Sequence, residues 1–178
     1  MPAQPAPDPA APELRSIYEA GVDYVWETLR RFGVRDADLE DVTHDVFVAV
    51  QRKLAGYDSS RPLKPWLFCF ALRAAADYRG SSRVRREIVG EIPDAADPAP
   101  GPDDRLEAAE ARELLLAALD TLALELRSVL VLHDMDGVPM PAIAAALGGS
   151  VNTHYSRLRL ARRSFTAALR RLRLRRGA

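Results

Sequence analysis

The chain has 178 residues, of which 48% are hydrophobic and 28% charged, a composition that excludes wholesale disorder and suits one ordinary domain or two small ones. Its 25 basic and 25 acidic residues cancel, so an affinity for a charged partner must come from how the charges are distributed. Because no run of about 18 apolar residues occurs, we expect no membrane insertion. The single cysteine, Cys69, offers no disulfide and no ligand cluster, so we expect a cytoplasmic protein.

The first half of the chain predicts three amphipathic helices and no strand. Residues 1–12 are rich in Ala and Pro and lack the basic and apolar segments of a signal peptide, so we expect a disordered tail there. Apolar residues recur at helical spacing over residues 13–32 and 39–54, and Asp38 with Asp41 has the spacing of a capping pair. After a loop at residues 56–62, Pro65 suits the first turn of a third helix that runs to about Arg79 or beyond.

The second half of the chain predicts a separate helical unit. Residues 93–102 are too rich in proline for the interior of a helix or a central strand. We therefore expect a flexible, acidic, proline-rich linker over residues 91–104 that tethers a domain at 13–90 to a domain at 105–178. In the second domain we expect helices over residues 105–122, 124–135 and 141–147, a turn at 148–150, and a long helix from Val151.

The end of the chain is strongly basic and has the parts of a DNA-binding motif. No acidic residue follows His154, and arginines accumulate there: Arg157, Arg159, Arg162, Arg163, Arg170, Arg171, Arg173, Arg175 and Arg176. A short helix, a glycine turn and a longer basic helix make up a helix-turn-helix, whose second helix enters the major groove of DNA. Helical spacing places polar side chains on one face of that helix, opposite an apolar stripe. They are Asn152, Tyr155, Ser156, Arg159 and Arg163, whose types contact base edges and phosphates.

Read together, the two halves resemble one protein family. Leu39-Glu40-Asp41-Val42-Thr43-His44-Asp45-Val46-Phe47 resembles region 2.2 of the extracytoplasmic-function sigma factors, which belong to the sigma-70 family of bacterial RNA polymerase. Tyr57-Asp58 and Pro65-Trp66-Leu67-Phe68 resemble regions 2.3 and 2.4. Residues 130–137, 143–144, 147–148 and 153–158 resemble region 4. The resemblance implies an all-α fold, in which a three-to-four-helix bundle of region 2 precedes the helix-turn-helix of region 4.

The resemblance also implies a function and its residues. Such a protein binds core RNA polymerase and promoter DNA, directs transcription initiation, and is commonly held by an anti-sigma factor. The acidic pair Asp41 and Asp45 would dock on a coiled coil of the polymerase's largest subunit. The minus-ten strand would be held by Tyr57, Ser59, Ser60, Arg61, Lys64, Arg73 and Arg79. The minus-thirty-five duplex would be read by Asn152, Thr153, Tyr155, Ser156, Arg157, Arg159 and Arg163.

Other classes of protein remain as alternatives. A stand-alone helix-turn-helix regulator would use the N-terminal helices for dimerisation or ligand binding, but a neutral protein with one basic helix makes few phosphate contacts and should bind DNA weakly unaided. A purely structural helical adaptor leaves the acid-free arginine helix unexplained. An enzyme needs convergent catalytic groups, whereas His44, His133 and His154 are scattered along the sequence. We therefore expect no catalytic residue, cofactor, metal or small-molecule substrate.

Overall fold

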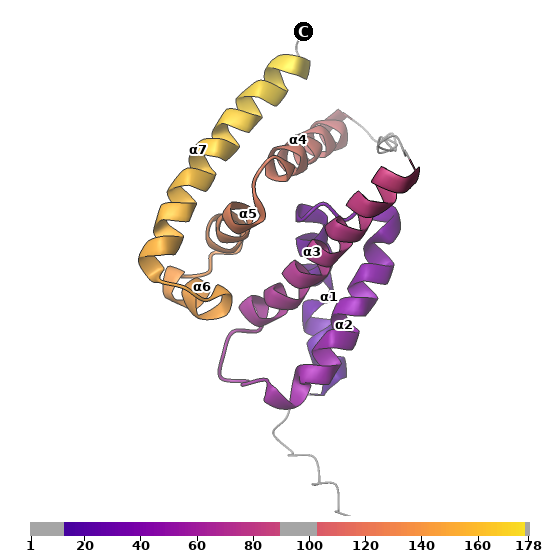
Figure 1. Cartoon of the computed structure of the whole chain (residues 1–178), viewed down its shortest axis with the longest axis vertical. Coiled ribbons are helices and arrows are strands. Elements are labelled where there is room, and N and C mark those ends of the chain that lie inside the picture. Colours follow the sequence, from indigo (N-terminus) through magenta and orange to yellow (C-terminus); the bar gives the residue numbers. More distant parts are fainter. Residues whose placement is uncertain (1–12, 90–102, 177–178) are drawn as a thin grey trace, which may run out of the picture.

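The computed structural model describes residues 13–89 and 103–176, and every regular element within these ranges is helical (Figure 1). The first half contains α1 (Leu14–Arg31), α2 (Leu39–Lys53) and α3 (Leu63–Val89), with short 3-10 turns η1 (Asp36–Asp38) and η2 (Leu54–Gly56) on either side of α2. The second half contains α4 (Asp103–Asp120), α5 (Leu124–Leu130), the π-helical segment η3 (Val131–Met135), α6 (Met140–Leu147) and α7 (Val151–Arg176). The all-α fold class is confirmed.

The structure bears on several local expectations. The third helix, expected to run to about Arg79 or beyond, continues through Gly80 and Ser81 as far as Val89 and agrees with that expectation. The last two residues of the expected linker, at 103 and 104, already belong to α4. The rest of that linker and the expected tail at 1–12 lie outside the described residues. The helix expected over residues 124–135 changes to π-helical geometry at Val131, because Asp136 N–H bonds to the carbonyl five residues before it, at 3.0 Å.

The expected capping pair at the start of α2 does not form. Asp38 makes no side-chain bond to the first turn of α2. Its backbone is already helical, with φ −105° and ψ −5°, whereas a capping residue is normally extended. The carboxylate instead accepts hydrogen bonds from the Tyr78 hydroxyl at 2.5 Å and from Arg35 Nε at 2.9 Å. Asp38 therefore ties the start of α2 to α3.

The first three helices pack as a bundle around a common apolar core. α1 and α3 approach closely where Gly21 faces Leu67, since a Cβ atom built on Gly21 would lie 2.3 Å from Leu67 Cδ1. Glycine is needed at this crossing because any side chain would occupy the space of the leucine. The buried hydrophobic residues of the bundle are Ile17, Val25, Leu29, Phe32, Val34, Leu39, Val46, Phe47, Val50, Leu67, Phe68, Ala71 and Ala75.

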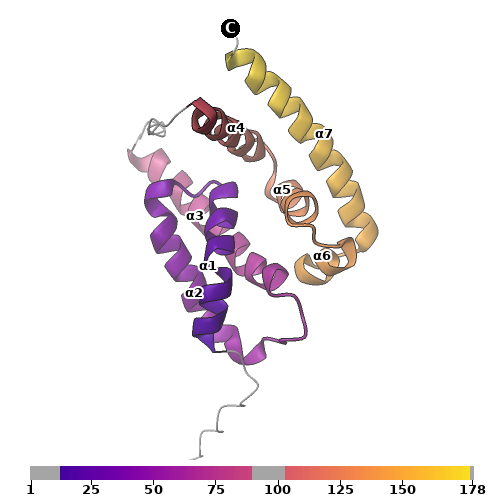
Figure 2. The ribbon, with the colours of Figure 1, turned by 180° about the vertical axis from the view of Figure 1, so that it is seen from behind.

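The second half packs against the first instead of standing apart from it. α5 and α6 lie against α7, α4 contacts both α7 and α1, and α6 contacts α3. Views from both sides show the same arrangement (Figures 1 and 2). The buried residues of both halves form one hydrophobic cluster, which runs from Ile17 in α1 to Ala161 in α7. The sequence suggested two domains on a tether, but in this state of the chain they share a core.

Candidate nucleic-acid interface

The turn before α7 is held by a glycine pair and by two polar side chains. Gly148 and Gly149 both have positive φ, 74° and 87°, a backbone conformation that favours glycine. Ser150 caps α7, because its Oγ accepts the backbone N–H of Thr153 at 3.1 Å. His154, which is 0% exposed, lies with its Nε2 2.7 Å from the carbonyl oxygen of Gly148. Since a carbonyl only accepts, this nitrogen carries the hydrogen and fastens the turn to the helix.

His154 has a structural role in the core that the sequence analysis did not assign to it, because a histidine was not counted among the apolar residues of α7. The sequence contained a signal for it, because His154, Leu158 and Ala161 recur at the spacing of one helix face and all three are buried. The Nδ1 atom of His154 is buried without a hydrogen-bond partner. The histidine therefore packs in the interior of the helix-turn-helix as an apolar residue would, and uses Nε2 alone to bond the turn.

The outer face of α7 has the arrangement that helical spacing predicted. Its members Asn152, Tyr155, Ser156, Arg159 and Arg163 are all exposed. Tyr155 is the most conspicuous of them, because an aromatic side chain that is 52% exposed gains little from the protein core. Thr153 and Arg157 lie on the flank of this face, where the Thr153 hydroxyl is 2.8 Å from that of Ser150 and Arg157 is half-buried.

An ion pair holds α7 against the preceding segment. Arg162 donates two hydrogen bonds to the Asp134 carboxylate, at 2.8 and 2.7 Å. These two hydrogen bonds are the main reason why the pKa of Asp134 lies below its usual range. A hydrogen bond from His133 lowers the pKa further. A shallow hollow of about 470 Å³ lies beside the pair and is lined by His133, Tyr155, Leu158, Arg159 and Arg162. Arg162 is therefore engaged within the protein, whereas Arg159 and Arg163 belong to the outer face.

The loop between α2 and α3 is ordered by Asp58. Its Oδ1 accepts the backbone N–H of Ser60 at 3.0 Å and the Ser60 hydroxyl at 2.6 Å, and its Oδ2 lies 3.2 Å from Arg61 Nε. The Ser60 bonds hold the pKa of Asp58 below its usual value. Tyr57 Oη donates to the Arg61 carbonyl at 3.1 Å and closes the loop from the other side. Ser59, Ser60 and Arg61 are all exposed on this preformed turn.

An aromatic group supports this loop. The ring of Tyr57 lies 4.4 Å from that of Trp66, which in turn meets Phe70 edge-on at 4.9 Å. Trp66 is half-buried and packs against the core, as its position beside a Leu/Phe stripe suggested. Lys64 is exposed with its ammonium 5.6 Å above the Tyr24 ring.

The remaining predicted residues fall in three different environments. Arg73 is exposed on α3. Arg79 is engaged, because its guanidinium lies 3.1 Å from Asp120 in α4 and 3.5 Å from the carbonyl of Phe32. Asp41 and Asp45 are exposed on α2, one turn apart, with exposed His44 between them in sequence. The residues predicted for the minus-ten strand are therefore not all brought together, because Arg79 is held at Asp120 of α4 whereas Ser59, Ser60 and Arg61 lie on the loop before α3.

Two classes of site are not found in the described residues. Within residues 13–89 and 103–176, no group of three or more His, Cys, Asp or Glu side chains is arranged to hold a metal ion. No helix in the same ranges has the length and apolar character needed to span a membrane.

Family comparisons match both halves of the chain. The model of Sigma-70 region 2 matches residues 17–85, and the model of Sigma-70, region 4 matches residues 112–165. The RNA polymerase sigma factor NccH of Alcaligenes xylosoxydans xylosoxydans is 33% identical over 147 residues, covering 80% of this chain and 79% of NccH. The ECF RNA polymerase sigma factor SigL of Mycobacterium tuberculosis is 31% identical over 160 residues, covering 89% and 90% of the two chains.

Solved structures agree with this result. CnrH, determined in complex with the cytosolic domain of CnrY, superposes with a TM-score of 0.61 at 28% identity, covering 88% of this chain and 86% of CnrH. The sigma factor RpoE of Bartonella quintana, determined with the anti-sigma factor NepR, has the same fold, with a TM-score of 0.66 at 19% identity over 88% of this chain and 96% of RpoE. Because the matches span both halves in the family's order, the chain belongs to the sigma-70 family and is an extracytoplasmic-function sigma factor, which directs RNA polymerase to promoters.

Proposed function

We propose that region 4, over residues 105–178, reads the minus-thirty-five duplex through the outer face of α7. The observation that carries this proposal is an exposed polar face on a helix whose entry is fixed by Ser150 and His154. A recognition helix has to present its first turns at a defined angle, since its N-terminal residues contact the base edges. Asn152, Tyr155, Ser156 and Arg159 lie in those turns and meet this requirement, and Arg163 extends the same face by one turn. Thr153 and Arg157, on its flank, would contact the neighbouring phosphates.

We propose that region 2, over residues 13–90, holds the minus-ten strand on the loop ordered by Asp58. Bases that leave the duplex are held by aromatic and polar groups. The Tyr57–Trp66 pair supplies an aromatic edge, and the nearby chain adds exposed donors at Ser59, Ser60, Arg61 and Lys64. Exposed Arg73 continues the basic track along α3, and Arg79 joins it only when it leaves Asp120.

We propose that the polymerase binds α2 through Asp41 and Asp45. Residues four apart on a helix share a face, so the two exposed carboxylates present a paired negative charge to a basic partner. Because the partner is polymerase, the protein works in the cytoplasm, and it acts by binding and not as an enzyme. The CnrH structure shows a relative held by the cytosolic domain of another protein, which supports an anti-sigma factor as a further partner of this chain.

Run-off transcription tests the assignment of α7. Core polymerase, a pooled genomic promoter library and this protein should give start sites that are absent without the protein. The double variant Arg159→Ala/Arg163→Ala should lose those start sites, because both side chains lie on the proposed reading face. Arg171→Ala is the matched control, since this exposed arginine lies on another face of the same helix. Normal transcription by the double variant would contradict the assignment.

Core binding tests the assignment of α2 separately. Asp41→Asn/Asp45→Asn should weaken binding to core polymerase by about tenfold or more, since each change removes a charge from a charge-complementary contact. Asp23→Asn removes an exposed acid from α1 and should leave binding unchanged. Equal affinities for all three proteins would exclude α2 as the docking helix.

A further inference from the structure

The recognition helix is much longer than the part of it that is proposed to read DNA. α7 has 26 residues and is therefore about 39 Å long at about 1.5 Å per residue. It forms the outer edge of region 4 along its whole length (Figures 1 and 2). The proposed reading residues end at Arg163. The turns beyond them carry further arginines, which are Arg170, Arg171, Arg173, Arg175 and Arg176.

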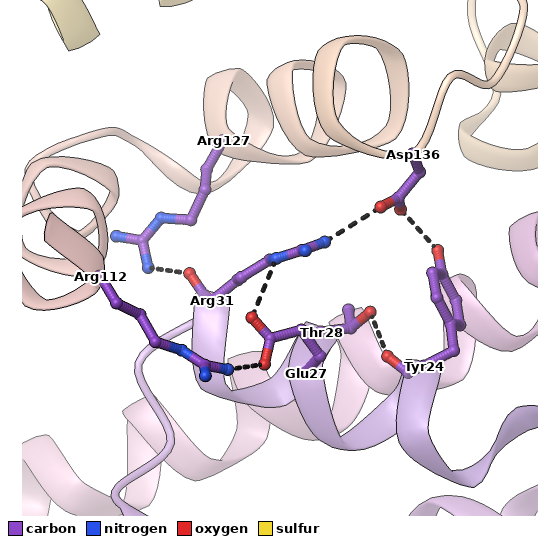
Figure 3. A network of polar contacts seen from close by, with 7 residues as sticks. All are labelled: Tyr24, Glu27, Thr28, Arg31, Arg112, Arg127 and Asp136. Atoms are coloured by element: carbon purple, nitrogen blue, oxygen red, sulfur yellow. Dashed lines mark hydrogen bonds and ion pairs between the residues drawn. The ribbon is translucent and has the colours of Figure 1, made fainter. Parts of the chain in front are cut away.

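The contacts between the two halves of the chain leave the outer side of α7 free. Figure 3 shows Asp136, which follows η3, accepting hydrogen bonds from Tyr24 and Arg31 of α1, at 2.8 and 3.0 Å. Arg112 of α4 bonds to Glu27 of α1, and α6 packs on α3. Region 4 therefore meets region 2 mainly through α4, α6 and the turn after η3, while α7 lies on the far side of these elements.

One side of α7 carries a polar stripe from its first turn to its last. Helical spacing continues the line of Asn152, Arg159 and Arg163 through Arg170 and Arg173. All five side chains are exposed. None of them has a hydrogen-bond or ion-pair partner among the residues that the structure describes. Because α7 contains no acidic residue, the positive charge of the stripe is not neutralised from within the helix.

The other arginines at this end of α7 point elsewhere. Arg176 donates to Glu113 of α4 at 3.0 Å and to the carbonyl of Glu110 at 3.2 Å, so it holds α7 against α4. Arg171 and Arg175 are exposed and lie four residues apart, which places them together on the flank of the stripe. Arg171 Nε lies 3.4 Å from a carbonyl oxygen one turn back along its own helix.

The chemistry of the stripe changes after Arg163. The first turns present amide and hydroxyl groups of the kinds that read base edges. Beyond Arg163, the Thr166 hydroxyl already donates to the carbonyl of Arg162 at 2.9 Å, and Ala167 has no polar group. Only Arg170 and Arg173 remain there as donors. Arginines without neighbouring acceptors match phosphate, which is present at every nucleotide and carries no sequence information.

The length of the helix places these two arginines outside the groove. The major groove is about 12 Å wide. From Asn152 to Arg163, α7 already covers about 17 Å at about 1.5 Å per residue. Arg170 and Arg173 lie about 10 and 15 Å further along the same axis. A helix that enters the groove with its first turns therefore brings its far end over the phosphate backbone and not over the bases.

An acidic protein is the other class of partner for a basic stripe. Protein interfaces have an apolar core, and the exposed leucines of α7 are Leu160 and Leu174, at 42% and 74%. They lie about 21 Å apart at about 1.5 Å per residue, with only the half-buried Ala167 between them on that side. They form no continuous apolar patch, so the stripe favours the DNA backbone.

We propose that Arg170 and Arg173, the distal arginine pair, bind the phosphate backbone beside the minus-thirty-five element and anchor region 4 there independently of base sequence. This inference rests on the proposed function of α7. The pair lies on the same stripe as the reading residues. Its contact with the backbone therefore adds affinity and fixes the angle at which the first turns enter the groove.

The salt dependence of DNA binding tests the anchor. Holoenzyme assembled with this protein is bound to a duplex that carries the minus-thirty-five element, and the affinity is measured over a range of salt concentrations. Arg170→Gln/Arg173→Gln should make the slope of log affinity against log salt shallower by about 1.8, since each phosphate contact contributes about 0.9. Because both side chains are exposed, the fold should be unaffected.

Arg171→Gln/Arg175→Gln is the matched control. It removes two charges from the same end of α7, but from the flank and not from the stripe, so the slope should stay at its wild-type value. An equal change of slope in this control would show that only the net charge matters and would overturn the anchor. An unchanged slope in Arg170→Gln/Arg173→Gln would also overturn it, and a fall in transcription by that variant would then indicate a protein partner.

Sequence preference separates the anchor from the reading face. The ratio of affinities for duplexes with an intact and a replaced minus-thirty-five element should be unchanged in Arg170→Gln/Arg173→Gln and should fall in Arg159→Ala/Arg163→Ala. A lower ratio in the first variant would mean that the distal arginine pair reads bases, which contradicts the anchor. If only Arg159→Ala/Arg163→Ala affects binding, the anchor fails and the proposed function of α7 stands. If neither double variant affects binding, the proposed function fails as well.

Discussion

Asp134 lies within η3 and Asp136 directly follows it, and the two carboxylates hold different parts of the chain. Asp134 pairs with Arg162 and fastens the recognition helix to region 4. Asp136 pairs with Tyr24 and Arg31 and fastens region 4 to region 2. The π-helical segment ends between the two residues, since the bond from Asp136 N–H to the carbonyl of Val131 closes η3.

The Asp134–Arg162 pair should make the stability of region 4 depend on pH. The pKa of Asp134 is lower in the folded protein than in the unfolded chain, so its stabilisation is present above the unfolded pKa of about 4 and is lost as pH falls through the folded pKa. Urea denaturation of wild type and Asp134→Asn should therefore differ at neutral pH and converge in acid. A difference that stays constant from pH 7 to pH 2 would show that the carboxylate charge contributes nothing.

His154 and Tyr155 are neighbours whose replacements should have opposite consequences. His154→Ala removes a fully buried ring and its bond to Gly148, and we expect it to lower the free energy of unfolding by about 2–4 kcal/mol. Tyr155→Ala removes an exposed ring and should change stability by no more than about 0.5 kcal/mol, while promoter binding falls. Denaturation curves and binding assays on both variants separate the two roles. Similar losses of stability would contradict the assignment of His154 as the residue that fixes the turn.

Much of the fold could be predicted because the relevant signals are local. The periodicity of α1, α2 and α7 lies within each helix, and the outer face of α7 follows from the same periodicity. The pairing of Tyr24 with Asp136 has no such signal, since the two residues are 112 positions apart. In the sequence, both residues look like ordinary polar side chains. Their pairing becomes visible only in the folded chain, where the two halves are in contact.

Two further features escaped sequence reasoning for physical reasons. Arg127 looks like a surface residue of an amphipathic helix, yet it is fully buried because the end of α1 and Asp120 supply its partners. The π-helical turn has no distinct composition, and residues 124–135 read as one continuous α-helix. Both depend on tertiary contacts that the pattern of a single helix does not contain.

The loop ordered by Asp58 should matter for promoter opening and not for folding. Asp58→Ala removes the acceptor that organises Ser60 and Arg61 on an exposed surface, so helix content and thermal stability should stay at wild-type values. Formation of the open complex, followed by permanganate reactivity of unpaired thymines, should become slower. Asp36→Ala removes an exposed acid outside this loop and serves as the control. Equal opening rates for both variants would remove the loop from the proposed minus-ten surface.

Gly21 and Gly80 should respond to the same substitution with opposite signs. Both lie inside helices, where alanine is intrinsically favoured over glycine by about 0.5–1 kcal/mol. A Cβ atom on Gly80 meets nothing within 4 Å, so Gly80→Ala should stabilise the protein. A Cβ atom on Gly21 would lie 2.3 Å from Leu67 Cδ1, so Gly21→Ala must push α1 and α3 apart or displace the leucine, at a cost of about 1–3 kcal/mol. Urea denaturation of the two variants tests this directly, and because helix propensity is common to both, the difference between them measures the close approach of α1 and α3 alone.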